Sequence, residues 1–275
     1  MADGDDSGAT RRSGHTGRVG PTGQAGPTGQ DEPTGWDEPT GRAAGRADRG
    51  ARRGGDVLVY TRTTGYRHDS IPAGAAALAA LARAAGLTPE TTEDPGAFTT
   101  ARLARCAAVV LLSTTGTVLT DEGRTAFEAY VRDGGGVLAV HAAANAEPDW
   151  PFYGELLGTR FAGHPALQPG VVCAEDPGHP ATAALPARWE WTDEWYDFTA
   201  HPRAAGVRVL ARVDENSYRG GTLGADHPLV WCREAVPGRG RFLFTALGHA
   251  TEAYADPAFC AHLAGALGWV ARTTG

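Results

Sequence analysis

Residues 134–145 read GGGVLAVHAAAN, and this stretch decides the fold. Glycines end one element, the apolar run GVLAV has the length of a buried strand, and His141 follows at its tip. In doubly wound α/β enzymes a strand that ends in such a tight, small-residue turn presents a nucleophilic Ser or Cys. Because this chain presents an imidazole there, the stretch predicts a functional strand tip with different chemistry.

Outward from this stretch, short apolar runs alternate with helical patterns. Continuous apolar runs predict buried strands at residues 56–62 and 107–116, and a weaker pattern predicts one at 87–92. Helices are predicted at residues 73–86 and after Thr120, which is a good N-cap residue. This alternation predicts an α/β, doubly wound, mostly parallel sheet with helices on both faces.

The C-terminal half has a looser pattern. Residues 237–240, PGRG, form a turn signal between two apolar runs and therefore predict an antiparallel extension of the sheet. A closing helix is expected from about Asp256 to Arg272. The predicted strands of this half are PGVVCAED (169–176), VRVLARVD (207–214), HPLVWCREA (227–235) and GRFLFTALGH (240–249).

Two regions of different composition divide the chain. Residues 1–54 contain almost no aliphatic side chains and repeat the tripeptide PTG every six residues. Such a segment buries too little apolar surface to offset its ordering entropy, so a disordered Gly/Pro/Thr-rich tail is predicted. Residues 55–275 are predicted to form one domain.

Composition excludes several classes of function. The net charge of −7 argues against a nucleic-acid partner, and all 25 basic residues are arginine, which excludes Schiff-base chemistry. No apolar run is long enough to span a membrane, and the N-terminus lacks the apolar core of a signal peptide, so a cytoplasmic protein is expected. Whether it forms a homo-oligomer is left open. The scattered cysteines are expected to be small buried hydrophobes: Cys106, Cys173, Cys232 and Cys260.

Polar side chains follow several predicted strands at their carboxyl ends, where open α/β sheets bind ligands. Three histidines, His68, His141 and His249, are among them. Two later segments, FAGHP with His164 and WEWTDEWYDF with Glu194, are expected to close over the crevice. The candidate catalytic residues are His68, His141, His164, Glu194 and His249.

Other residues are candidates for binding a substrate. Trp and Tyr rings are good faces on which to stack a sugar ring, while carboxylates bond its hydroxyls, although the same aromatic residues could simply pack an irregular region. Asp226 and His227 could face the site or stabilise a turn. The candidate substrate-binding residues are Asp69, Ser70, Thr114, Thr115, Trp150, Asp193, Trp195, Tyr196, Asp226 and His227.

A divalent metal such as zinc is one of two chemistries open to this site. Imidazole and carboxylate are usual zinc ligands, and the candidates are His141, His164, Glu194 and His249. None of them shows the local H-x-x-x-H or H-x-E spacing of a strong metal motif. Acid–base catalysis without a metal is therefore the second option.

The chain resembles the ThuA-like family, named for trehalose utilisation, over nearly all of residues 56–272. The resemblance implies a fold similar to class I glutamine amidotransferases, which is flavodoxin-like. Those enzymes carry a catalytic Cys where this chain has His141, so glutamine hydrolysis is not expected. The motifs that carry the resemblance are GYRHDSI, LLSTTG, GGGVLAVHAAA, DWPFYGELLG, FAGHPALQPG, HPATAALP, WTDEWYDF, LGADHPLVWC and TALGHATEAYADPAF.

The resemblance implies a role in sugar metabolism. One hypothesis is an enzyme that acts on a disaccharide, a keto-sugar or a related glycoside through its His/carboxylate site, with an imidazole or Glu194 moving a proton. The alternative is a non-catalytic carbohydrate-binding module or an accessory subunit of a sugar dehydrogenase. A pure binding site has no need of three imidazoles, and this distinguishes the two.

Overall fold

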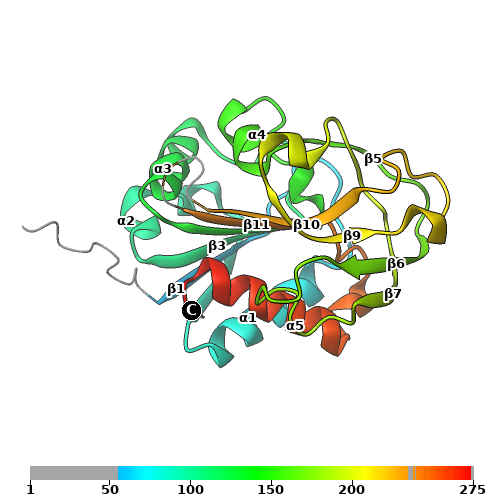
Figure 1. Ribbon diagram of the computed structural model, residues 1–275. Helices are drawn as coiled ribbons and strands as arrows, with labels where there is room; N and C mark the ends of the chain where they lie inside the picture. Colours follow the sequence, from blue (N-terminus) through cyan, green and yellow to red (C-terminus); the bar gives the residue numbers. More distant parts are fainter. Residues whose placement is uncertain (1–54, 235–237, 239, 274–275) are drawn as a thin grey trace, which may run out of the picture. The chain divides into compact units, whose positions relative to one another are not determined.

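A computed structural model describes residues 55–234, 238 and 240–273 of the chain (Figure 1). The predicted tail, residues 1–54, lies outside the described residues, as do residues 235–237 and 239, which include part of the PGRG turn. A nine-stranded sheet organises the described part. Its strands, in spatial order, are β2 (Thr88–Thr92), β1 (Asp56–Tyr60), β3 (Cys106–Leu112), β4 (Gly136–Val140), β11 (Arg241–Thr245), β10 (His227–Glu234), β9 (Arg208–Val213), β6 (Gln168–Ala174) and β7 (Arg188–Asp193).

The pairing confirms the predicted change from a parallel to an antiparallel sheet. Strands β2, β1, β3, β4 and β11 all pair in parallel. From β11 onward each pair, β11 with β10, β10 with β9, β9 with β6 and β6 with β7, is antiparallel. Strand β7 and a small sheet made of β5 (Phe161–Gly163) and β8 (Asp197–Phe198) were not predicted as strands.

Helices cover both faces of the sheet, as predicted (Figure 1). Helix α1 (Ile71–Ala84) and helix α5 (Pro257–Val270) lie on one face; α2 (Thr100–Leu103), α3 (Asp121–Arg132) and α4 (Pro151–Leu157) lie on the other. Thr120 caps α3 as expected, because its hydroxyl accepts a hydrogen bond from the Gly123 amide at 3.0 Å. Single 3₁₀ turns span Pro95–Ala97, His141–Asn145, Pro202–Ala205, Glu215–Ser217 and Thr251–Ala255.

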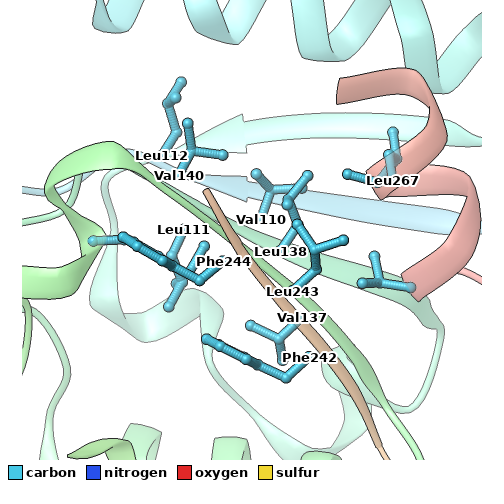
Figure 2. Close-up of a cluster of buried hydrophobic side chains, with 14 of the residues drawn as sticks. Val110, Leu111, Leu112, Val137, Leu138, Val140, Phe242, Leu243, Phe244 and Leu267 are labelled. Atoms are coloured by element: carbon cyan, nitrogen blue, oxygen red, sulfur yellow. The ribbon is translucent and has the colours of Figure 1, made fainter. Parts of the chain in front are cut away.

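The core lies against the middle of the sheet, where β3, β4 and β11 are neighbours. Val110 pairs with Leu138, and Leu138 pairs in turn with Leu243, so one row of apolar side chains crosses three strands. Figure 2 shows this row with Leu267 of α5 over it. All four side chains are at most 1% exposed. This burial on both faces explains why these strands read as continuous apolar runs.

One edge of the sheet collects the carboxyl ends of the parallel strands, because β1, β3, β4 and β11 run in the same direction. The loops that follow them are tied together. Thr63 and Thr115 form an isolated parallel bridge, and the Ser113 amide donates to the Val140 carbonyl at 3.0 Å. The ends of β1, β3 and β4 are therefore joined at this edge. In the ranges that the structure describes, no helix is both long and apolar enough to cross a membrane.

Candidate active site

His141 stands at the tip of β4 in an unusual backbone conformation. Its φ is +53°, in the left-handed region that non-glycine residues seldom adopt. Ser113, at the end of the neighbouring β3, has a φ of +47°. Behind His141 a 3₁₀ turn of buried alanines continues the chain without side chains that would block the imidazole. Two adjacent strands therefore end in strained residues at the same edge, which is typical of functional sites.

The protonation of the His141 ring is fixed by a backbone carbonyl. Its Nδ1 lies 2.7 Å from the Ala246 carbonyl oxygen, which can only accept, so Nδ1 carries the proton. Nε2 is then left with its lone pair. This carbonyl-bonded arrangement is the one that orients metal-binding or basic histidines in proteins.

Several polar groups converge on His141 Nε2. The Tyr196 hydroxyl lies 2.9 Å away, His68 Nε2 3.2 Å away, and the Glu194 carboxylate 3.5 Å away. His249 completes the cluster, with its Nδ1 3.1 Å from the same Glu194 oxygen. One ligand atom from each of His68, His141, Glu194 and His249 lies within 4.8 Å of the others. The three strand-end histidines thus meet, as the sequence predicted, and we call these four residues the histidine centre.

The electrostatics hold this centre ready to bind a cation. Burial and the neighbouring imidazoles of His141 and His249 lower the pKa of His68 to about 3, so it is neutral near pH 7. Burial raises the pKa of Glu194, but the adjacent imidazoles of His141 and His249 outweigh it and hold that pKa well below its usual range. Glu194 in turn raises the pKa of His249.

His164 lies beside the centre rather than within it. Its Nε2 is 3.6 Å from the Glu194 carboxylate, and its ring stacks on Tyr196 at a centroid distance of 5.6 Å. Nδ1 lies 2.8 Å from the Pro165 carbonyl and donates to it, so Nε2 is the nitrogen that faces Glu194. The pairing of β5 with β8 brings this segment onto the site.

Asp193 supports the centre from within the protein. Its carboxylate is fully buried and accepts hydrogen bonds from the amides of Glu194 and Gly248, at 2.9 and 2.8 Å, and from the Trp191 indole at 2.9 Å. The His249 amide approaches it at 3.2 Å. Asp193 therefore fixes two residues of the centre through their backbones instead of bonding a substrate, which corrects its predicted role.

Changing Asp193 to Asn is expected to lower the free energy of unfolding by about 2 kcal/mol, because an amide NH₂ would replace an acceptor that faces N–H donors. Turnover should fall as well, since Glu194 and His249 would shift. Chemical denaturation measures the first effect, with the exposed Asp149→Asn as the matched control. Equal stability of the two variants would show that Asp193 does not hold this loop.

Gly248 allows the Asp193 contact to form. Its φ of +116° is open only to glycine, and a Cβ at this position would lie 2.8 Å from the Tyr254 hydroxyl oxygen. Ser70, a predicted substrate-binding residue, is buried and donates to the Gly248 carbonyl at 3.4 Å. The loop before His249 is thus held from two sides, and Ser70 is one of its supports.

The other predicted residues near the strand ends differ in burial and in whether they contact the histidine centre. Tyr196 contacts His141 directly, and burial raises its pKa well above the usual value, so its phenol keeps the proton. Thr114 is buried, and its hydroxyl has no hydrogen-bond partner among the described residues. Thr115 donates to the Tyr66 carbonyl at 2.7 Å. Asp69 is exposed, and its charge acts on His249.

Four other predicted substrate-binding residues lie elsewhere. Trp150 packs against Phe127 and Phe152, and Trp195 is fully buried. Asp226 forms a two-bond ion pair with Arg203 at 2.7 and 2.9 Å, while His227 is fully buried against Glu215 at 2.7 Å. Trp195 and His227 are buried away from an open ligand surface, which corrects their predicted role. Trp150 and Asp226 are partly exposed, but Trp150 packs against other rings and Asp226 is held in its ion pair.

Two aromatic side chains near the centre, Tyr66 and Phe161, are not among the predicted site residues. Tyr66 is 66% exposed and its ring lies 4.8 Å from that of His68. Phe161 is partly buried and lies 4.6 Å from the Tyr196 ring. Tyr66 stands two residues before His68 in the same strand-end loop, so its position in the sequence was the available signal.

The donor set of the histidine centre fits a divalent metal ion. The single lone pair of His141 Nε2 faces two groups, Tyr196 and His68, and only one of them can donate into it. His68 Nδ1 is also buried and has no hydrogen-bond partner in the described part of the chain. Imidazole nitrogens with a carboxylate oxygen are a usual zinc set, and one cation would satisfy the converging lone pairs. His68 replaces His164 in the predicted ligand set.

Comparison with known proteins agrees with this architecture. A sequence model of the ThuA family, described as trehalose utilisation, matches residues 56–270. A crystal structure of a putative ThuA-like protein from Bacteroides uniformis is 25% identical, with a TM-score of 0.61 over 82% of this chain and 95% of that one.

A second putative ThuA-like protein, from Parabacteroides merdae, is 22% identical, with a TM-score of 0.63 over 80% of this chain and 90% of that one. No curated protein matches the chain significantly. The family match covers all the strands and all but a few residues of the described domain. The chain therefore belongs to the ThuA family of trehalose-utilisation proteins.

Proposed function

We propose that this protein is an enzyme of sugar metabolism that performs acid–base chemistry on a disaccharide, a keto-sugar or a related glycoside at the histidine centre. One observation carries the proposal: His68, His141, His249 and Glu194 bring their ligand atoms within 4.8 Å of one another at the carboxyl edge of the sheet. A structural role does not need three imidazoles around one carboxylate, whereas proton transfer and metal binding do.

The centre would hold a divalent metal, with zinc as the best fit, through His68, His141, His249 and Glu194. Such an ion supplies Lewis-acid chemistry, polarising a sugar oxygen or lowering the pKa of a bound water. Two of the ligands are in the required protonation states, because His68 is neutral and Glu194 is ionised. The raised pKa of His249 means that a metal must displace its proton.

Two residues beside the centre are placed to move protons. His164 turns its Nε2 toward the site and is one-third exposed, so its neutral ring can take a proton from a hydroxyl or from a carbon next to a carbonyl. Tyr196 holds its phenol proton and can donate it to a developing oxyanion. The exposed ring of Tyr66 offers the apolar face on which a sugar stacks.

The sheet also supports a relationship to class I glutamine amidotransferases, which we retain as part of the proposal. His141 occupies a strained, positive-φ strand tip like the one that presents a nucleophile in other α/β enzymes. An imidazole there with Nδ1 bonded to a carbonyl is a ligand or a base instead of a nucleophile. Glutamine hydrolysis is accordingly not proposed.

The first test is the metal content of protein expressed without a histidine tag and dialysed in chelator-free buffer. About one divalent ion per chain is expected, measured by inductively coupled plasma mass spectrometry. A chelator should remove the ion and lower the melting temperature. Protein that binds no zinc, manganese, cobalt or nickel on titration would contradict the metal centre and leave acid–base catalysis by His164 and the other imidazoles.

The second test is turnover of disaccharides and keto-sugars, followed by NMR with each metal in turn. Product from at least one sugar is expected. A saturable sugar-binding isotherm without product under any metal or nicotinamide condition would instead favour the alternative, a carbohydrate-binding module or an accessory subunit of a sugar dehydrogenase.

A further inference from the structure

A groove of about 590 Å³ opens beside the edge strand β7, outside the histidine centre. It combines apolar and acidic walls. Leu167 is one of its side chains and is 48% exposed, although a large aliphatic residue normally avoids water. The residues used in the argument are Leu167, Glu190, Trp191, Ala250, Glu252 and Asp256.

The groove neighbours the histidine centre along two chain segments and His164 along a third. His164 leads to Leu167, His249 is followed by Ala250, and Glu194 comes three residues after Trp191. Three residues of extended chain span at most about 10 Å. The backbone at Ala250 and Trp191 therefore lies within about 10 Å of His249 and Glu194, and that at Leu167 within about 10 Å of His164.

Trp191 gives the groove a rigid aromatic wall. Its indole stacks on Phe259 at a centroid distance of 5.6 Å and lies 4.2 Å from the Trp189 ring. Its N–H donates to Asp193, the residue that fixes His249 and Glu194. An aromatic ring held from several sides loses little entropy when a ligand stacks on it.

The acidic side chains supply the polar part of a sugar site. Glu190 and Glu252 are exposed, and Asp256 caps α5 through one oxygen with hydrogen bonds to the Ala258 and Phe259 amides. Carboxylates accept hydrogen bonds from ring hydroxyls, while an indole face and an aliphatic side chain cover the apolar face of the ring. The three carboxylates of the groove would repel an anionic ligand.

We propose that this groove binds the second, neutral ring of a disaccharide or glycoside whose first ring lies at the histidine centre. The inference rests on the proposed function for the identity of the first site. It assigns specificity for glycosides over monosaccharides to Leu167, Glu190 and the Trp191 ring, none of which belongs to the centre.

The test is calorimetric titration of the full chain with glucose and with trehalose, maltose, cellobiose and sucrose. At least one disaccharide is expected to bind more tightly than glucose. In the double variant Leu167→Ala/Glu190→Gln that preference should fall by about tenfold, while glucose affinity stays within about twofold. The exposed Glu122→Gln, at the start of α3, is the matched control and should change neither.

Two results would overturn the groove as a subsite. One is equal affinity for glucose and every disaccharide in the unchanged protein. The other is a disaccharide preference that survives the double variant. If the double variant loses the disaccharide preference and the unchanged protein shows no turnover, the groove is supported and the catalytic proposal is contradicted. If the unchanged protein turns over a disaccharide and the double variant does so equally well, the catalytic proposal is supported and the groove is contradicted.

Discussion

Replacing His141 by Asn is expected to lower turnover of the best sugar substrate by at least about a thousandfold. Its Nε2 is the point on which Tyr196, His68 and Glu194 converge, and Asn places no donor atom there. The same variant should lose its divalent metal. Turnover and metal content are measured on one preparation, so a single variant tests both parts of the proposed centre.

Asn is the substitution of choice because of the local backbone. His141 has a φ of +53° and is fully buried, so Ala would be strained and would leave the Ala246 carbonyl without its donor. Asn tolerates the left-handed region and its side-chain amide can donate to that carbonyl.

The melting temperature of this variant shows whether a loss of turnover comes from lost chemistry or from a damaged fold. The melting temperature of the His141→Asn protein, compared with that of metal-stripped wild type, should change little. His201→Asn, in a surface loop, is the control and should retain turnover and metal. Activity within tenfold of wild type in the His141 variant would remove this residue from the mechanism.

The parallel half of the fold could be predicted because its information is local. Strands such as β3 and β4 are buried on both faces, so each appears as an unbroken apolar run, and a capped helix, α3, follows β3. Parallel direction then fixes where the strand ends meet, so the sequence predicts that His68, His141 and His249 lie together.

Strand β7 and the role of Trp195 could not be predicted in the same way. The run WEWTDEWYDF mixes aromatic and acidic residues, and nothing local distinguishes a buried Trp195 from a ring that faces a ligand. The distinction comes from tertiary contacts, since Trp195 packs against Tyr218 and against Gly170 of β6. Trp191, two strand positions before Asp193, is the ring that borders an open groove.

The choice between His68 and His164 as a metal ligand also depends on tertiary contacts that the sequence does not give. Sequence reasoning included His164 and left out His68, because both lie in loops and their directions depend on packing. In the structure, His68 Nε2 is 3.2 Å from His141 Nε2, while His164, whose Nδ1 bonds the Pro165 carbonyl, approaches the centre at Glu194, 3.6 Å away. A loop histidine's role is decided by what its second nitrogen bonds.

Acid is expected to destabilise this protein through His262, a buried histidine of α5 outside the histidine centre. Burial lowers its pKa to about 4, although a hydrogen bond to the Ala181 carbonyl at 2.7 Å partly opposes the shift. The ordinary pKa of 6.5 applies to the unfolded chain. Between these two values the unfolded state binds a proton that the folded state does not.

The sign of the effect follows from this difference in proton binding. Above about pH 6.5 both states are neutral at this residue and stability does not depend on it. As pH falls from about 6.5 to 4, stability falls by about 1.4 kcal/mol per unit, and the total approaches about 3 kcal/mol. Below about pH 4 both states are protonated and the dependence ends.

His262→Gln should remove this part of the acid sensitivity, because Gln does not titrate and its amide can still reach Ala181 or Thr245, the two partners of the native ring. Urea unfolding at several pH values measures how steeply the free energy of unfolding changes with pH. A loss of packing in the variant lowers this free energy equally at every pH and leaves the slope unchanged. The exposed-loop variant His201→Gln should keep the wild-type slope. Parallel stability curves for wild type and His262→Gln would mean that His262 carries its proton in the folded protein too, and that water or a local opening reaches the space between α5 and β11.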